Sequence, residues 1–146
     1  YDAPNLKKLL SNPNNQKLLH YARFDVAMIW KHLNIKLENI FCTKIASRLC
    51  RTYTDQHGLK DLCNELINVK ISKQQQSSNW GAKNLSEEQK VYAAGDVLYL
   101  HELRTKLLTM LSDNGRLELA QNIFNFIATR VELDLKGFEE IDIFAH

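Results

Sequence analysis

Residues 17–53, KLLHYARFDVAMIWKHLNIKLENIFCTKIASRLCRTY, contain the pattern that decides the fold of this chain. Two short apolar runs, 17–21 and 39–42, predict strands. Each run is followed by apolar residues at helical spacing, which predict helices over 24–33 and 43–53. Strand, helix, strand and helix in that order favour a parallel α/β arrangement.

The segments on either side of this unit are predicted to be helical. A short helix is expected at 2–10, another over 59–66 and a last one over 116–129. Ser86 and Gln89 have the spacing of a capping box, so they open a long helix that runs to about Leu111 and stops at Asp113-Asn114-Gly115. The polar stretch 70–85 connects two of these helices.

Composition and length predict one soluble globular domain that spans residues 1–146. Hydrophobic residues make up 45% of the chain and charged residues 25%, which excludes a disordered chain. No apolar run approaches the ~20 residues of a membrane span. The net charge of +2 neither requires nucleic acid nor excludes a local basic groove. Three cysteines without CxxC spacing and no leader-like start predict buried, reduced thiols and a cytoplasmic protein.

Asp96 is the first unusual residue, because it lies in an apolar stripe of the long predicted helix. The stripe comprises Tyr92, Asp96, Tyr99, Leu100, Leu103 and Leu107, at steps of three and four. A carboxylate there is costly to bury unless a partner compensates it. That partner is either a structural cation or N–H, or a metal ion with Tyr92 beside it. Gly95, just before Asp96, predicts that another backbone or a ligand comes close.

Asp25 is the second unusual residue, because it follows a predicted strand of the parallel sheet. Ligands gather at the carboxyl ends of such strands, but an acidic residue in a first helical turn is also favoured by capping and by the helix dipole. Together Asp25 and Asp96 supply oxygen ligands for a hard cation. Two carboxylates are too few to hold a two-metal centre firmly. The residues alone therefore indicate metal-dependent phosphate chemistry.

Two stretches resemble the exonuclease motifs of the ribonuclease D family. His20-Tyr21-Ala22-Arg23-Phe24-Asp25 is similar to its second motif, and Tyr92-Ala93-Ala94-Gly95-Asp96-Val97-Leu98-Tyr99-Leu100 to its third, Tyr-x-x-x-Asp. The segment Lys73-Gln74-Gln75-Gln76-Ser77-Ser78-Asn79-Trp80 resembles the stretch between them. The resemblance runs from about Tyr1 to Leu111, with the motifs in the family's order.

The resemblance implies a helix-rich, RNase H-like 3′–5′ exonuclease fold of the α/β class. It implies a metal-dependent exoribonuclease that hydrolyses RNA 3′ ends to 5′-mononucleotides, with two divalent ions, Mg²⁺ or Mn²⁺, held by four acidic residues. Asp25 then corresponds to the third acid, at the second metal, and Asp96 to the fourth, at the metal that holds the nucleophilic water. Tyr92 corresponds to the residue that orients this water.

The chain departs from the family at its front, where no Asp-x-Glu precedes Asp25. We expect this first motif, and the first strands of the sheet, upstream of Tyr1, which leaves the edge of the 17–21 strand exposed and hydrophobic. That edge predicts pairing with a second copy as a homodimer. The alternative to the enzyme is a catalytically inactive nucleic-acid-binding or oligomerising remnant of the fold.

The expected partners are RNA 3′ ends, with single-stranded DNA as a second substrate. Arg23 and Lys73 are candidates to meet phosphates. Trp80 either stacks on a base or packs in the core, and the core is favoured. His20, at the end of a strand, is expected to be structural.

Overall fold

A computed structural model describes residues 2–71, 75 and 77–146, and it confirms the predicted strand–helix–strand–helix unit. The unit consists of β1 (Lys17–Leu19), α2 (Ala22–Leu33), β2 (Ile40–Cys42) and α3 (Thr43–Cys50). Within the described residues the sheet has two strands, which pair in parallel with Lys17 opposite Ile40 and Leu19 opposite Cys42. The carboxyl ends of both strands therefore lie at one edge, where β2 passes directly into α3 and only two residues separate β1 from α2.

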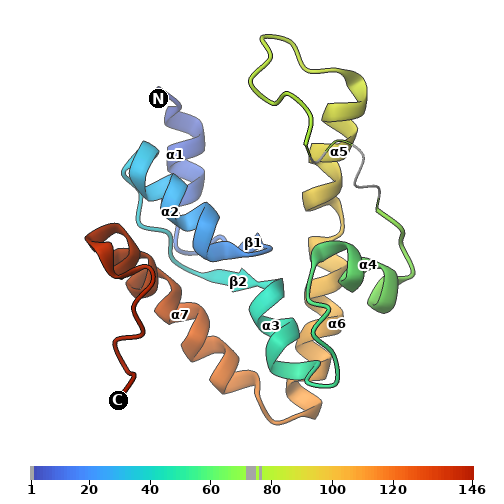
Figure 1. The fold of residues 1–146 in the computed structure, drawn as a ribbon, viewed down its shortest axis with the longest axis vertical. Helices are drawn as coiled ribbons and strands as arrows, with labels where there is room; N and C mark the ends of the chain where they lie inside the picture. Colours follow the sequence, from blue (N-terminus) through green and yellow to red (C-terminus); the bar gives the residue numbers. More distant parts are fainter. Residues whose placement is uncertain (1, 72–74, 76) are drawn as a thin grey trace.

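The remaining helices lie on both sides of this small sheet. They are α1 (Pro4–Ser11), α4 (Leu59–Ile67), α5 (Glu87–Leu98), α6 (Leu100–Asp113) and α7 (Leu117–Leu133), with a short π-helical turn, η1 (Asp134–Phe138), after α7. Helix α6 contacts β1, and α7 contacts β2. Figure 1 shows α5 and α6 along one side of the molecule and α7 with the C-terminal tail along the other.

The prediction of one long helix from Ser86 to Leu111 is wrong, because the helix breaks at Tyr99. The backbone of Tyr99 has ψ −2°, far from the value of about −42° that continues an α-helix. Beyond this break α6 buries four leucines, Leu100, Leu103, Leu107 and Leu111, whereas the described residues of α5 bury Gln89 alone. The two segments thus face different surroundings, and the expected continuous stripe from Tyr92 to Leu107 does not exist.

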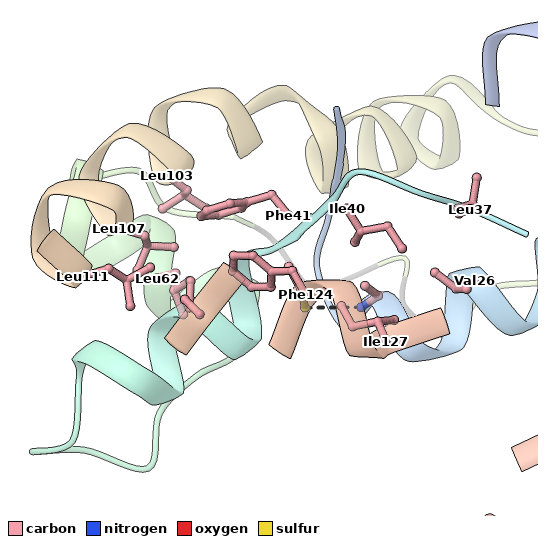
Figure 2. Packing of buried hydrophobic residues seen from close by; sticks show 14 of the residues in the cluster. Val26, Leu37, Ile40, Phe41, Leu62, Leu103, Leu107, Leu111, Phe124 and Ile127 are labelled. Atoms are coloured by element: carbon pink, nitrogen blue, oxygen red, sulfur yellow. Dashed lines mark hydrogen bonds between the residues drawn. The ribbon is translucent and has the colours of Figure 1, made fainter. Parts of the chain in front are cut away.

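The core lies between β2 and the two long C-terminal helices (Figure 2). Phe41 of β2 contacts Phe124 of α7, with ring centroids 4.9 Å apart. Leu103 and Leu107 of α6 lie beside this pair, and Val26 of α2 packs at the other end of the cluster. The core therefore joins α2, which carries Asp25, to both α6 and α7.

The predicted burial of the cysteine thiols agrees with the structure. The three cysteines, Cys42, Cys50 and Cys63, are buried and free. Among the described residues, no helix is both long and apolar enough to cross a membrane.

Candidate active site

Asp25 and Asp96 line the same pocket, although they come from helices far apart in the sequence. The pocket has a volume of about 280 Å³ and lies at the carboxyl end of β1, where Leu19 and His20 form part of its wall. Leu18, Leu59, Val97 and Leu100 complete the lining. The structure thus brings together the two acids that the sequence singled out.

The local backbone explains how Asp25 reaches this pocket. Two residues after β1 ends, Tyr21 adopts a left-handed conformation (φ 65°), and α2 starts at the next residue. The Phe24 N–H donates to the Tyr21 carbonyl at 3.1 Å, and the Ala22 N–H donates to Cys42 Sγ at 3.4 Å. Asp25 lies in the first turn of α2 but is not its N-cap, which is Tyr21. The capping explanation for Asp25 is therefore wrong, although the helix dipole still favours its charge.

The two acids hold their protons more tightly than usual. Burial raises the pKa of Asp25, and the negative charge of Asp96 raises it further. Partial loss of water against the pocket wall also raises the pKa of Asp96. Two carboxylates that repel each other in one pocket are stabilised by a cation between them, so the electrostatics favour cation binding.

The expectation that Asp96 is buried in an apolar stripe is wrong. Its side chain is exposed, as are its neighbours Val97 and Leu98. The reason is the break at Tyr99, which turns α6 toward the core and leaves α5 on the outside of the described molecule. The backbone approach expected at Gly95 is also absent among the described residues, since a Cβ there would meet no described atom within 4 Å.

His20 contributes a neutral ring to the pocket wall. Burial, together with the nearby Lys44 charge, lowers the pKa of His20 to about 4. Its Nδ1 lies 2.9 Å from the Thr43 hydroxyl, which itself donates to the Leu19 carbonyl. A hydroxyl has one hydrogen to give, so the His20 Nδ1–H is the donor of this pair. The bond joins the ends of both strands, in agreement with the structural role expected for His20.

Tyr92 lies within the electrostatic reach of Asp96 but lines an adjacent groove. Burial raises the pKa of Tyr92, and the charge of Asp96 adds to this, so the phenol keeps its proton at neutral pH. The groove has a volume of about 460 Å³ and also includes Gly95 and Tyr99. Tyr92 is therefore a neutral hydrogen-bond donor one helical turn from Asp96.

The favoured core placement of Trp80 is wrong. Its side chain is 39% exposed, and its ring lies 5.8 Å from that of Tyr92. The turn before it is tied to α5, because the Gln89 side chain donates to Ser78 Oγ at 3.0 Å and to the Asn79 carbonyl at 3.2 Å. These bonds hold the indole on the surface beside Tyr92, in a position open to a stacking partner.

The two candidate phosphate contacts have different outcomes. Arg23 forms an ion pair with Asp134, at 2.6 Å between Nε and Oδ2, so its guanidinium is already engaged by the C-terminal segment. Nothing in the sequence signals this pairing, because it spans 111 positions. Lys73 lies outside the described residues.

The acids present fit a divalent cation only in part. Carboxylate oxygens suit Mg²⁺ or Mn²⁺, and Mg²⁺ is often held by one or two carboxylates with waters and substrate phosphates. Across residues 2–71, 75 and 77–146, however, no three His, Cys, Asp or Glu side chains form a group able to hold a metal. Asp25 and Asp96 therefore fit as ligands of one shared cation and are too few for a pair of ions.

Comparison with known sequences finds one family along most of the chain. The sequence model of a 3′–5′ exonuclease family matches residues 1–112. Ribonuclease D of Gluconacetobacter diazotrophicus is 35% identical over 80% of this chain and 30% of its own length. DNA polymerase I of Aquifex aeolicus is 32% identical over 77% of this chain and 19% of its own length. The chain thus spans less than a third of these curated relatives.

Comparison with solved structures finds similar molecules over nearly the whole chain. NrnC of Brucella melitensis has a TM-score of 0.96 and 53% identity, covering 99% of this chain and 70% of that one. Further NrnC structures contain pGG and Mg²⁺. Escherichia coli RNase D has a TM-score of 0.81 and 26% identity, covering 90% of this chain and 35% of that one.

Proposed function

Because this chain belongs to the 3′–5′ exonuclease family and shares its RNase H-like fold, we propose that Asp25 and Asp96 are part of the acidic metal site of an exoribonuclease. The observation that carries this proposal is their convergence in one pocket at the carboxyl end of β1. Their raised pKa values add support, because perturbed acids in a cleft are typical of functional sites.

The proposed reaction is an in-line displacement at the last phosphodiester of an RNA 3′ end, which releases a 5′-mononucleotide. Asp25 and Asp96 would hold a divalent ion, which when bound would supply Lewis-acid stabilisation of the attacking and leaving oxygens. Asp96 is assigned as a ligand on the side of the nucleophilic water, and Asp25 on the side of the leaving group. The protonated Tyr92 hydroxyl orients the water.

The proposed cofactor and substrate are chosen by chemistry and by similarity. Hard oxygen donors suit Mg²⁺ and Mn²⁺, and Mg²⁺ is tried first because one NrnC structure contains it. Short RNA is tried first because another NrnC structure contains pGG. Trp80, exposed beside Tyr92, is proposed to stack on a base. Single-stranded DNA is the second substrate to test.

A non-catalytic role is the second candidate, and one observation favours it. The described residues place two acids, and not a larger group, around the pocket. A protein limited to those two acids would bind oligonucleotides, or pair with a second copy, without cleaving RNA. Turnover therefore separates the two candidates.

The deciding experiment measures digestion by the longest natural chain that contains these 146 residues. A 3′-labelled oligoribonucleotide and pGG are incubated with Mg²⁺ or Mn²⁺, with and without chelator. Asp96→Asn is expected to lose more than about 100-fold of the metal-dependent rate, since even partners behind metal ligands are worth 10–100-fold. Glu87→Gln on the same helix is the control, because Glu87 is 80% exposed and pairs only with Lys90 among the described ion pairs.

Two results contradict the proposal. The enzyme assignment fails if the parent protein binds oligonucleotides and releases no nucleotide with either ion. The site assignment fails if Asp96→Asn digests as fast as Glu87→Gln.

A further inference from the structure

We propose that the C-terminal segment positions the active-site helix: Asp134, held by Arg130, grips Arg23 and thereby fixes the first turn of α2, which carries Asp25. The inference rests on the proposed function, because it assigns Asp134 and Arg130 as positioning residues for that same site. It concerns the part of the chain beyond the match to the exonuclease family, which ends at residue 112.

Arg23, Asp134 and Arg130 form a clamp, in which Arg23 and Asp134 are joined by a bidentate ion pair. Arg23 Nε donates to Asp134 Oδ2 at 2.6 Å, and Arg23 Nη2 donates to Oδ1 at 2.7 Å. The same Nη2 also donates to the Glu139 carbonyl at 3.0 Å. A guanidinium held by two parallel bonds to one carboxylate is fixed in orientation as well as position.

Arg130 binds the same carboxylate at Oδ1, the oxygen that also accepts from Arg23 Nη2. Its Nε and Nη2 donate to Asp134 Oδ1 at 3.0 and 2.8 Å. Its Nη2 also donates to the Phe138 carbonyl at 2.6 Å, which secures the turn after α7. Asp134 is 12% exposed between the two guanidinium groups, and its hydrogen bond to Arg23 lowers its pKa, so it stays ionised at neutral pH.

The first turn of α2 is anchored on its inner side by Ala22, which has no exposed surface, while Arg23 holds its outer side through Asp134. Its N-cap, Tyr21, makes no side-chain capping bond and is 52% exposed. A weak bond from the Ala22 N–H to Cys42 Sγ ties this turn to β2. Arg23 and Asp25 are two residues apart on a helix, so their side chains point to different faces. The ion pair between Arg23 and Asp134 therefore fixes the orientation of the first turn of α2, and with it the direction in which the Asp25 side chain points.

The test compares Asp134→Asn and Arg23→Lys in the longest natural chain that contains these residues. Asp134→Asn keeps the shape of the side chain and removes its charge. Arg23→Lys keeps the charge and loses the guanidinium geometry that allows two parallel hydrogen bonds. In metal-free protein, hydrogen exchange of the amides of residues 22–26 is expected to accelerate in both variants. In the active protein, the Mg²⁺ concentration for half-maximal rate is expected to rise about 10-fold, with a smaller change in the rate at saturating Mg²⁺.

Glu132→Gln is the matched control. Glu132 lies on α7, the helix that carries Arg130, and pairs with Lys36 and Lys136, away from Arg23. The variant is expected to change neither exchange at 22–26 nor the Mg²⁺ requirement. A double-mutant cycle then separates positioning from general stabilisation. If Asp134 acts through Asp25, Asp134→Asn weakens Mn²⁺ binding, measured by calorimetry, in the parent and not in Asp25→Asn.

The clamp is overturned if both variants exchange at 22–26 like the parent, or if Asp134→Asn weakens Mn²⁺ binding equally in the parent and in Asp25→Asn. These outcomes differ from failure of the proposed function. A parent protein without metal-dependent digestion refutes the enzyme, whereas the exchange measurement on metal-free protein still decides whether the clamp holds α2.

Discussion

Asp25 and Asp96 reach one pocket from different surroundings. Asp25 follows the half-buried end of β1 and lies in the first turn of α2, whereas Asp96 lies on the outer helix α5 and is exposed. The pKa of each is nevertheless raised, because both carboxylates lose water against the same pocket wall. At the residue scale, the raised pKa values of Asp25 and Asp96 therefore depend on the pocket wall that both carboxylates face.

The Tyr92 hydroxyl provides the sharpest test at this scale. Tyr92→Phe removes one oxygen and keeps the ring that contacts Trp80. If the hydroxyl orients the water, we expect the rate to fall by about 10–100-fold with little change in unfolding midpoint. Tyr53→Phe is the control, since Tyr53 donates to Glu65, neither residue lines the pocket, and the change should leave the rate unaltered. Equal rates for the two variants would remove Tyr92 from the mechanism.

The raised pKa of Asp25 predicts a stability effect with a definite sign. The folded protein binds this proton more tightly than the unfolded chain, so the stabilising contribution is fully present below the unfolded pKa. It is lost as the pH rises through the raised folded pKa. At neutral pH the ionised Asp25 therefore destabilises the metal-free protein. Asp25→Asn is expected to raise its unfolding midpoint by roughly 1–3 °C, measured by calorimetry, with the gain shrinking as the pH falls.

The ionised Asp134 has the opposite effect on stability at neutral pH: it stabilises the folded protein. Its hydrogen bond to Arg23 lowers its pKa, so its stabilising contribution is present above the unfolded pKa and is lost as the pH falls through the folded one. Asp134→Asn should therefore lower the midpoint at neutral pH. A fall in the midpoint for Asp25→Asn as well would show that Asp25 is stabilised by a partner and is not a strained pocket acid.

At the scale of single elements, α5 is a weakly supported helix of the described molecule. It buries Gln89, while Val91, Val97 and Leu98 are exposed. Its start is secured locally, because Ser86 Oγ accepts from the Gln89 N–H and Gln89 Oε1 accepts from the Ser86 N–H. The capping box was predictable from the sequence, since both partners lie within one helical turn.

Loss of this cap should loosen the helix that carries Tyr92 and Asp96. Ser86→Ala is expected to cost about 1 kcal/mol, seen as faster hydrogen exchange in residues 87–92 and a lower unfolding midpoint. Ser112→Ala, near the exposed end of α6, is the matched control and should change neither. Unchanged exchange at 87–92 in Ser86→Ala would mean that tertiary contacts, not the cap, hold α5.

At the scale of the whole molecule, the core sets the positions of the helices. Leu107 of α6 has no exposed surface and belongs to the cluster that includes Phe41 of β2 and Phe124 of α7. The same cluster includes Val26 of α2, one residue after Asp25. The pocket acids therefore depend on a core built from segments that are distant in the sequence.

Leu107→Ala tests this dependence. The cavity is expected to lower the free energy of unfolding by about 2–5 kcal/mol, measured by denaturant titration. Leu98→Ala, at the end of α5, removes a side chain that is 65% exposed and should cost less than about 0.5 kcal/mol. Similar losses for the two variants would show that α5 and α6 are equally packed in solution.

Local patterns in the sequence were enough to predict much of this protein. The alternation of β1, α2, β2 and α3, the parallel pairing, the capping box of Ser86 and the buried thiols follow from spacing within a few residues. The exonuclease family also follows from short motifs around Asp25 and Asp96, whose order along the chain is a property of the sequence.

The tertiary structure alone decided the break at Tyr99, the exposure of Asp96 and the surface position of Trp80. It also decided the pairing of Arg23 with Asp134. The physical reason is common to all four. Helical spacing shows which residues share a face, but burial and ion pairing depend on which distant segment covers that face, and that is fixed only when the core assembles.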